Sequence, residues 1–153
     1  MGREVRRVPA DWKHPEYEAW EGHTGLKPLY DGATYQSAHD EFIEKLQAEG
    51  LQAAVDYFGG APDKNDYMPD WPDEECTHYM MYENTSEGTP ISPAFATPEE
   101  LARWLTDNNA SAFADQTASY EAWLNIACGG YAPSAVIDTG RLVSGVEFMA
   151  NEP

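Results

Sequence analysis

The most regular hydrophobic pattern in the chain lies between residues 97 and 108. Apolar side chains recur there at the spacing of one helix face: Leu101, Trp104 and Leu105. Thr97 supplies a side-chain cap, and Pro98 stands at the first helical position, where its missing amide hydrogen costs nothing. Glu100 completes a capping box with Thr97. The pattern predicts a helix that begins after Thr97 and ends near Asn108.

Two further segments have a helical period. In residues 37–58 six apolar positions follow it: Phe42, Ile43, Leu46, Leu51, Val55 and Phe58. Gly50 interrupts this pattern at a cost of about 1 kcal/mol relative to alanine, so we expect the helix to bend or restart there. Residues 117–128 place four apolar side chains on one face: Tyr120, Trp123, Leu124 and Ala127. The sequence therefore predicts about three helices.

Other segments favour extended structure. Residues 77–83 are rich in tyrosine and methionine, which suit a pleated surface, and residues 84–89 are typical of a turn. Two short apolar runs, 135–137 and 142–146, flank a turn sequence at residues 138–140, and this pattern indicates a hairpin. Together with the helices, these segments predict an α+β fold with a small antiparallel sheet.

Length and composition favour one compact domain, residues 1–153. The chain is 42% hydrophobic and has five tryptophans, which a disordered acidic tail would lack. No apolar run approaches the roughly 18 residues of a membrane-spanning helix, and no apolar segment follows the N-terminal arginines as a secretory signal requires. With only two cysteines, we expect no disulfide framework and a cytoplasmic location.

The net charge of −18 is distributed unevenly. Residues 1–13 form a basic arm with four basic and two acidic side chains, whereas the rest of the chain is strongly acidic. The arm either lies across the acidic body and neutralises part of it or contacts a partner. The acidic remainder repels nucleic acid and anionic membranes and attracts basic protein surfaces. We therefore expect no direct nucleic-acid or membrane partner, although acidity also serves solubility alone.

Residues 61–76 form an acidic loop with three prolines. The loop lacks the alternating ligands and central glycine of a calcium-binding EF-hand, since Tyr67 and Met68 occupy the fifth and sixth positions counted from Asp63. We predict no metal site here. Tyr67, Met68 and Trp71 lie among the carboxylates, an arrangement common at protein interfaces. Alternatively, Met68 and Trp71 point inward and hold the loop down.

Catalytic and cofactor motifs are absent from the sequence. None of the four histidines falls in a zinc-binding motif: His14, His23, His39 and His78. A cysteine nucleophile, Cys76 or Cys128, has no supporting pattern. There is no GxSxG nucleophile elbow and no phosphate-binding glycine motif. We therefore expect a binding protein rather than an enzyme, with no cofactor.

Several sequence blocks carry a resemblance: MGREVRRVPADWKHP, YMPDWP, MMYENTSEGTPISPAFATPEELARWL, SYEAWL and YAPSAV. They resemble a family of small phage and prophage proteins over most of the chain, apart from roughly residues 16–65. The resemblance implies a phage-encoded protein inside a bacterial host cell. It carries over no catalytic residue.

The leading hypothesis is a phage inhibitor of a host defence complex, either CRISPR or restriction, that binds by nucleic-acid mimicry. Carboxylates on a rigid surface would meet the lysine and arginine rows that otherwise bind DNA or RNA. The expected partner-binding residues are Asp63, Asp66, Asp70, Trp71, Asp73, Glu74, Glu75, Glu41, Glu44 and Asp56. The alternatives are an accessory enzyme or small-ligand protein with a pocket near residues 82–92, and a virion or assembly component that self-associates. The oligomeric state stays open.

Overall fold

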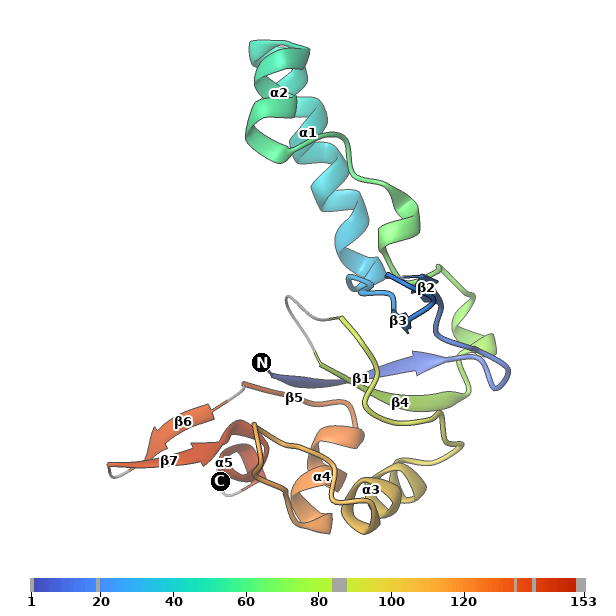
Figure 1. The fold of residues 1–153 in the computed structure, drawn as a ribbon, viewed down its shortest axis with the longest axis vertical. Coiled ribbons are helices and arrows are strands. Elements are labelled where there is room, and N and C mark those ends of the chain that lie inside the picture. Colours follow the sequence, from blue (N-terminus) through green and yellow to red (C-terminus); the bar gives the residue numbers. More distant parts are fainter. Residues whose placement is uncertain (1, 19, 84–87, 134, 139, 151–153) are drawn as a thin grey trace. The chain divides into compact units, whose positions relative to one another are not determined.

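The computed structural model describes residues 2–18, 20–83, 88–133, 135–138 and 140–150. The chain divides into two compact units (Figure 1). Unit 1 comprises Met1–Pro28 and Trp71–Pro153, and unit 2 comprises Leu29–Asp70. That the two units form one domain stays a prediction.

The described residues contain both helices and strands, which confirms the α+β class. The helices are α1 (Tyr35–Glu49), α2 (Leu51–Phe58), α3 (Pro98–Asp107), α4 (Tyr120–Ala127) and α5 (Gly145–Ala150). The strands are β1 (Arg3–Val8), β2 (Glu16–Glu18), β3 (Thr24–Leu26), β4 (His78–Glu83), β5 (Tyr131–Ala132), β6 (Ala135–Asp138) and β7 (Arg141–Ser144). Short 3-10 turns occupy Gly32–Thr34, Lys64–Asp66 and Asp73–Glu75.

The prediction of about three helices is wrong, because the described residues contain five. Gly50 has φ 91° and ψ 170°, so the predicted helix over residues 37–58 ends there and restarts as α2. The predicted strand over residues 142–146 ends at Ser144, and α5 begins at Gly145. The predicted turns at residues 84–89 and 138–140 lie partly outside the described residues.

Unit 1 is built on a three-stranded antiparallel sheet with the order β4-β1-β5. Strand β1 pairs along its whole length with β4, from Arg3 opposite Glu83 to Val8 opposite His78. Its other edge pairs Arg3 with Ala132 of β5. Residues 3–8 of the expected basic arm are thus the central strand of the sheet.

The outer edge of β4 is also hydrogen-bonded. Residues 89–95 run beside it, and Tyr79 and Phe95 exchange backbone hydrogen bonds of 2.7 and 2.9 Å. The Met81 amide donates to the Ser92 hydroxyl rather than to a carbonyl, at 2.9 Å. Because its backbone groups find partners in this segment, the β4 edge is protected from pairing with another chain.

The core of unit 1 lies between the sheet and two helices, α3 and α4, which contact each other and the strands (Figure 1). Its largest fully buried apolar side chains are Trp123, Met81, Leu101, Leu105, Ile126 and Val146. Helix α3 begins as predicted, since the Thr97 hydroxyl accepts a hydrogen bond from the Glu100 amide at 3.1 Å. Ser119 caps α4 in the same way through the Ala122 amide.

Unit 2 is a helical hairpin of α1 and α2, which lie side by side (Figure 1). Its buried apolar side chains are Leu29, Phe42, Ala54 and Met68. The two ends of the unit are joined by backbone hydrogen bonds, from the Tyr30 amide to the Asp66 carbonyl and from the Met68 amide to the Tyr30 carbonyl, at 2.9 and 2.8 Å. Gly32 packs so closely there that a Cβ would lie 2.7 Å from the Met68 carbonyl oxygen.

Candidate functional site

The predicted partner-binding residues are divided between the two units, because the boundary falls between Asp70 and Trp71. Unit 2 holds six of them: Glu41, Glu44, Asp56, Asp63, Asp66 and Asp70. Unit 1 holds the other four: Trp71, Asp73, Glu74 and Glu75. The nine carboxylate residues are exposed, whereas Trp71 is half-buried. Unit 2 therefore carries most of the predicted site.

Acidic side chains dominate unit 2. It has nine carboxylates, all exposed, and two lysines, for a net charge of −7 in 42 residues. Lys45 forms an ion pair with Glu49 on the next turn of α1, and its Nζ lies 4.7 Å from the centre of the Tyr57 ring. The lysines thus offset few of the carboxylates, and the hairpin presents a negative surface.

Local contacts hold several of these carboxylates in place. The Asp56 carboxylate accepts a hydrogen bond from the Gln52 side chain at 2.8 Å, one turn earlier on α2. The Asp63 carboxylate caps the turn Lys64–Asp66 through the Asn65 amide at 2.9 Å. These contacts orient the carboxylates of Asp56 and Asp63 on their own elements.

Helix α2 also exposes large apolar side chains, and three of them follow the helical period of the sequence: Leu51, Val55 and Phe58. The exposed fractions are 63% for Leu51, 36% for Val55, 72% for Tyr57 and 38% for Phe58. Sequence reasoning missed this surface. A signal was present, since α2 is short, lies between glycines, and has more apolar positions than a single partner helix covers.

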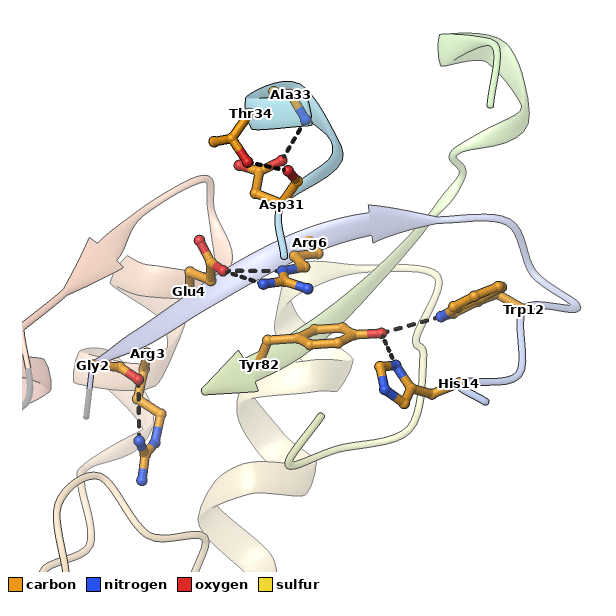
Figure 2. A network of polar contacts seen from close by, with 10 residues as sticks. All are labelled: Gly2, Arg3, Glu4, Arg6, Trp12, His14, Asp31, Ala33, Thr34 and Tyr82. Carbon is orange, nitrogen blue, oxygen red and sulfur yellow. Dashed lines mark hydrogen bonds and ion pairs between the residues drawn. The ribbon is translucent and has the colours of Figure 1, made fainter. Parts of the chain in front are cut away.

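Unit 1 contains a polar network around the buried side chain of Tyr82 (Figure 2). The Trp12 Nε1–H donates to the Tyr82 hydroxyl oxygen at 3.1 Å. His14 contacts the same hydroxyl through Nδ1 at 3.0 Å and the Lys27 carbonyl through Nε2 at 2.5 Å. A carbonyl only accepts, so Nε2 carries the ring proton and Nδ1 accepts the Tyr82 hydroxyl proton.

Burial shifts both titrating groups of this network toward their neutral forms. Desolvation lowers the pKa of His14. The hydrogen bond to the Lys27 carbonyl acts in the opposite direction and raises this pKa, whereas the nearby charge of Arg6 lowers it further. Desolvation likewise raises the pKa of Tyr82. The hydrogen bonds of Trp12 and His14 to Tyr82 fasten residues 12–14 to the sheet.

The basic side chains of β1 are engaged by the sheet itself. Arg3 is buried and lies 3.5 Å from the Glu83 carboxylate, while its Nε donates to the Ser111 carbonyl at 2.9 Å. Arg6 donates to Glu4 and covers the Tyr82 ring at 4.3 Å (Figure 2). Arg7 donates to the Cys76 carbonyl at 2.8 Å. These contacts give each arginine a role in holding the sheet together.

Met68 and Trp71, the apolar residues of the acidic loop, make contacts within their own units. Met68 is buried in unit 2 at 7% exposure. The Trp71 ring packs edge-to-face on Trp12 in unit 1, with centroids 4.8 Å apart. As for the expected pocket near residues 82–92, Tyr82 and Ser92 are buried, and residues 84–87 lie outside the described residues. That alternative and the assembly component stay predictions.

Within the described ranges, no three histidine, cysteine or acidic side chains gather as a metal site would require. No helix in that part of the chain is long and apolar enough to cross a bilayer. Comparison with protein-family models, curated proteins and solved structures gives no match. The fold and its surface thus define a small acidic α+β protein with a negatively charged helical hairpin.

Proposed function

We propose that this chain is a phage-encoded binding protein that acts in the bacterial cytoplasm. It inhibits a host defence complex, of the CRISPR or restriction type, by occupying the basic site that binds nucleic acid. The observation that carries the proposal is the surface of unit 2, which has nine exposed carboxylates and only two lysines.

The physical argument is one of charge spacing on a rigid support. Glu41 and Glu44 are three residues apart on α1, so they share a face and rise about 4.5 Å along the helix axis. DNA presents one negative charge per about 1.7 Å of axis over both strands, and proteins bind it through rows of lysine and arginine. A helix with repeated carboxylates therefore competes for such a row.

The test is inhibition of purified defence enzymes. CRISPR effector complexes and restriction enzymes are assayed for binding and cleavage of labelled DNA while the protein is titrated in. We expect the protein to displace DNA from one of them, with inhibition that weakens as salt rises from about 50 to about 500 mM, because exposed charge contacts are screened.

Two charge variants locate the site. Replacing three unit 2 carboxylates, Glu41→Gln with Glu44→Gln and Asp56→Asn, is expected to weaken inhibition at least tenfold. The matched control removes three exposed carboxylates of unit 1, Glu16→Gln with Glu18→Gln and Asp115→Asn, and leaves inhibition within about twofold. Inhibition that does not change with salt concentration, or that weakens equally in both variants, would contradict mimicry by unit 2.

A further inference from the structure

The exposed apolar side chains of α2 form a continuous stripe. At 3.6 residues per turn, Leu51, Val55 and Phe58 fall within an arc of about 60° on the helix surface. Tyr57 lies about 100° around the helix from Phe58, beyond the buried Ala54, and Lys45 of α1 covers its ring. Exposed apolar side chains that adjoin one another on a small helix mark an interaction site more often than isolated ones do.

The hairpin packs through Ala54 and Phe58 rather than through Leu51 and Val55. Ala54 of α2 is fully buried, and the Phe58 ring meets Phe42 of α1 at 6.0 Å between centroids. Leu51 and Val55 lie beyond these contacts and keep 63% and 36% of their surface exposed. Covering them with another apolar surface removes them from water, so a partner gains free energy there.

Charge decides what kind of partner fits. Carboxylates adjoin the stripe in sequence at Glu49 and Asp56, and unit 2 as a whole carries a net charge of −7. A second copy would bring the same carboxylates to the interface, where like charges repel. A partner with lysine or arginine on both sides of an apolar row matches the stripe and its surroundings together.

We propose that the α2 face is the docking surface for a basic amphipathic helix of a partner protein. The apolar row of that helix packs on Leu51, Val55 and Phe58, and its basic flanks meet the unit 2 carboxylates. This inference rests on the proposed function and deepens it. It divides the binding energy into an apolar part that resists salt and a charged part that salt weakens.

The probe is a synthetic peptide of leucine and lysine, about 18 residues long, with leucines at helical spacing so that it folds on contact. Two reference peptides accompany it, one with the same composition in scrambled order and one of lysine alone with the same charge. Affinities for the full-length protein are measured by fluorescence anisotropy. We expect the amphipathic peptide to bind at least tenfold more tightly than either reference, and to keep that ratio at high salt.

The variant Leu51→Gln with Val55→Gln removes two of the three apolar side chains of the row without changing charge. Both side chains are exposed, so the fold is retained, which circular dichroism checks. We expect the affinity of the amphipathic peptide to fall to that of the lysine peptide. The control, Leu26→Gln with Leu142→Gln, changes two exposed leucines of unit 1 and leaves the affinity within about twofold.

Three results would overturn this docking surface: equal affinities for the three peptides, an unchanged ratio in the Leu51/Val55 variant, or a protein dimer that this variant disperses. The last result would assign the stripe to a second copy. Failure of the proposed function is distinguishable. If the peptide results hold but no defence enzyme is inhibited, the docking surface stands and its defence target is wrong. If inhibition depends on the carboxylates but not on Leu51 and Val55, the function stands without the stripe.

Discussion

Helices α3 and α2 each carry an apolar stripe, yet only one of the stripes is buried. In unit 1, Leu101 and Leu105 of α3 are fully buried against α4 and the sheet. In unit 2, Leu51 and Val55 of α2 stay exposed beside a single partner helix. A sheet and a second helix together cover a full helix face, whereas one helix covers only a narrow strip. The difference separates a stripe that stabilises the fold from one that is available for binding.

The charged residues differ in the same way. In unit 1 the arginines of β1 are held by carboxylates and aromatic rings of their own sheet and by backbone carbonyls elsewhere in the unit. In unit 2 all nine carboxylates are exposed, and the ion pair of Lys45 with Glu49 neutralises only one of them. The arginines of β1 thus serve the structure of unit 1, whereas the carboxylates of unit 2 lie on its surface. Since all five tryptophans lie in unit 1, tryptophan fluorescence reports that unit, and amide exchange of α1 reports the other.

The largest effect is expected from Gly145→Ala at the start of α5. A Cβ at this position would lie 1.8 Å from the Pro133 carbonyl oxygen, so the backbone must shift. We expect a loss of about 4 kcal/mol or more in the free energy of unfolding of unit 1. Urea unfolding followed by tryptophan fluorescence measures it. Gly32→Ala is the counterpart in unit 2, where the Cβ would lie 2.7 Å from the Met68 carbonyl oxygen. We expect this variant to speed the amide exchange of α1 before it affects unit 1.

The buried and exposed helix faces are compared by truncation. Trp123→Ala removes a fully buried side chain from the core of unit 1 and is expected to cost about 3–5 kcal/mol. Leu51→Ala removes an exposed side chain from α2 and is expected to stay within about 0.5 kcal/mol. Because Trp123 is itself a fluorophore, circular dichroism follows both variants. A loss of several kcal/mol for Leu51→Ala would show that its stripe is part of a core.

Tyr82→Phe tests the polar network of unit 1. The change removes the hydroxyl and leaves the Trp12 Nε1–H and the His14 Nδ1 atom each without a hydrogen-bond partner in a half-buried setting. We expect a loss of about 1–3 kcal/mol in unfolding free energy. Tyr131→Phe, at an exposed tyrosine, is the control and should have little effect. Equal stability of the two variants would mean that the network contributes nothing.

The same network predicts how stability depends on pH. The pKa of His14 is lower in the folded chain than its ordinary value of 6.5, chiefly through desolvation. As the pH falls, His14 is therefore protonated in the unfolded chain before it is protonated in the folded chain. The contribution of neutral His14 to the free energy of unfolding is complete above about pH 6.5 and is lost as the pH falls below that value. Unfolding in urea between about pH 7.5 and 5.5 measures this loss. The glutamine in His14→Gln cannot gain a charge, so this variant should lack the loss of stability below pH 6.5. A midpoint above 6.5 in a proton NMR titration of His14 would contradict the lowered pKa.

The smallest effect concerns helix caps. Thr97→Ala deletes the side chain that caps α3, at an expected cost of about 1 kcal/mol. Thr34 precedes α1 but makes no capping hydrogen bond, and its hydroxyl donates to the Asp31 carbonyl instead. Thr34→Ala should therefore cost less than Thr97→Ala. Thermal unfolding separates the two, and the reverse order would show that capping does not fix the start of α3.

Much of the local structure could be predicted from sequence because its causes are local. The cap at Thr97 and the break at Gly50 depend on neighbouring residues alone. Helix α5 was missed because a six-residue helix has too few turns to show a period, and Val146 reads equally well as a strand residue. The partners of β1 were missed because antiparallel pairing of Arg3 with Glu83 joins distant parts of the chain.

The exposure of the carboxylates in the candidate site could be predicted for the same reason. Exposure of Glu41, Glu44 and Asp56 follows from their charge, since an isolated carboxylate is costly to bury. The apolar stripe of α2 was not predicted, because its spacing is the same whether the stripe is covered or not. The contact between His14 and Tyr82 was not predicted either, because only the folded sheet brings these residues together.

The sequence by itself determined that α3 begins after Thr97, that Gly50 interrupts a helical pattern, and that the molecule is strongly acidic, since each of these depends on a residue and its near neighbours. Only the tertiary structure decided that the basic N-terminal strand is the centre of a sheet, and that α2 keeps an apolar face exposed. The physical reason is that burial belongs to a pair of surfaces. A helix carries its apolar face in its sequence, but whether that face is buried depends on which other parts of the chain pack against it.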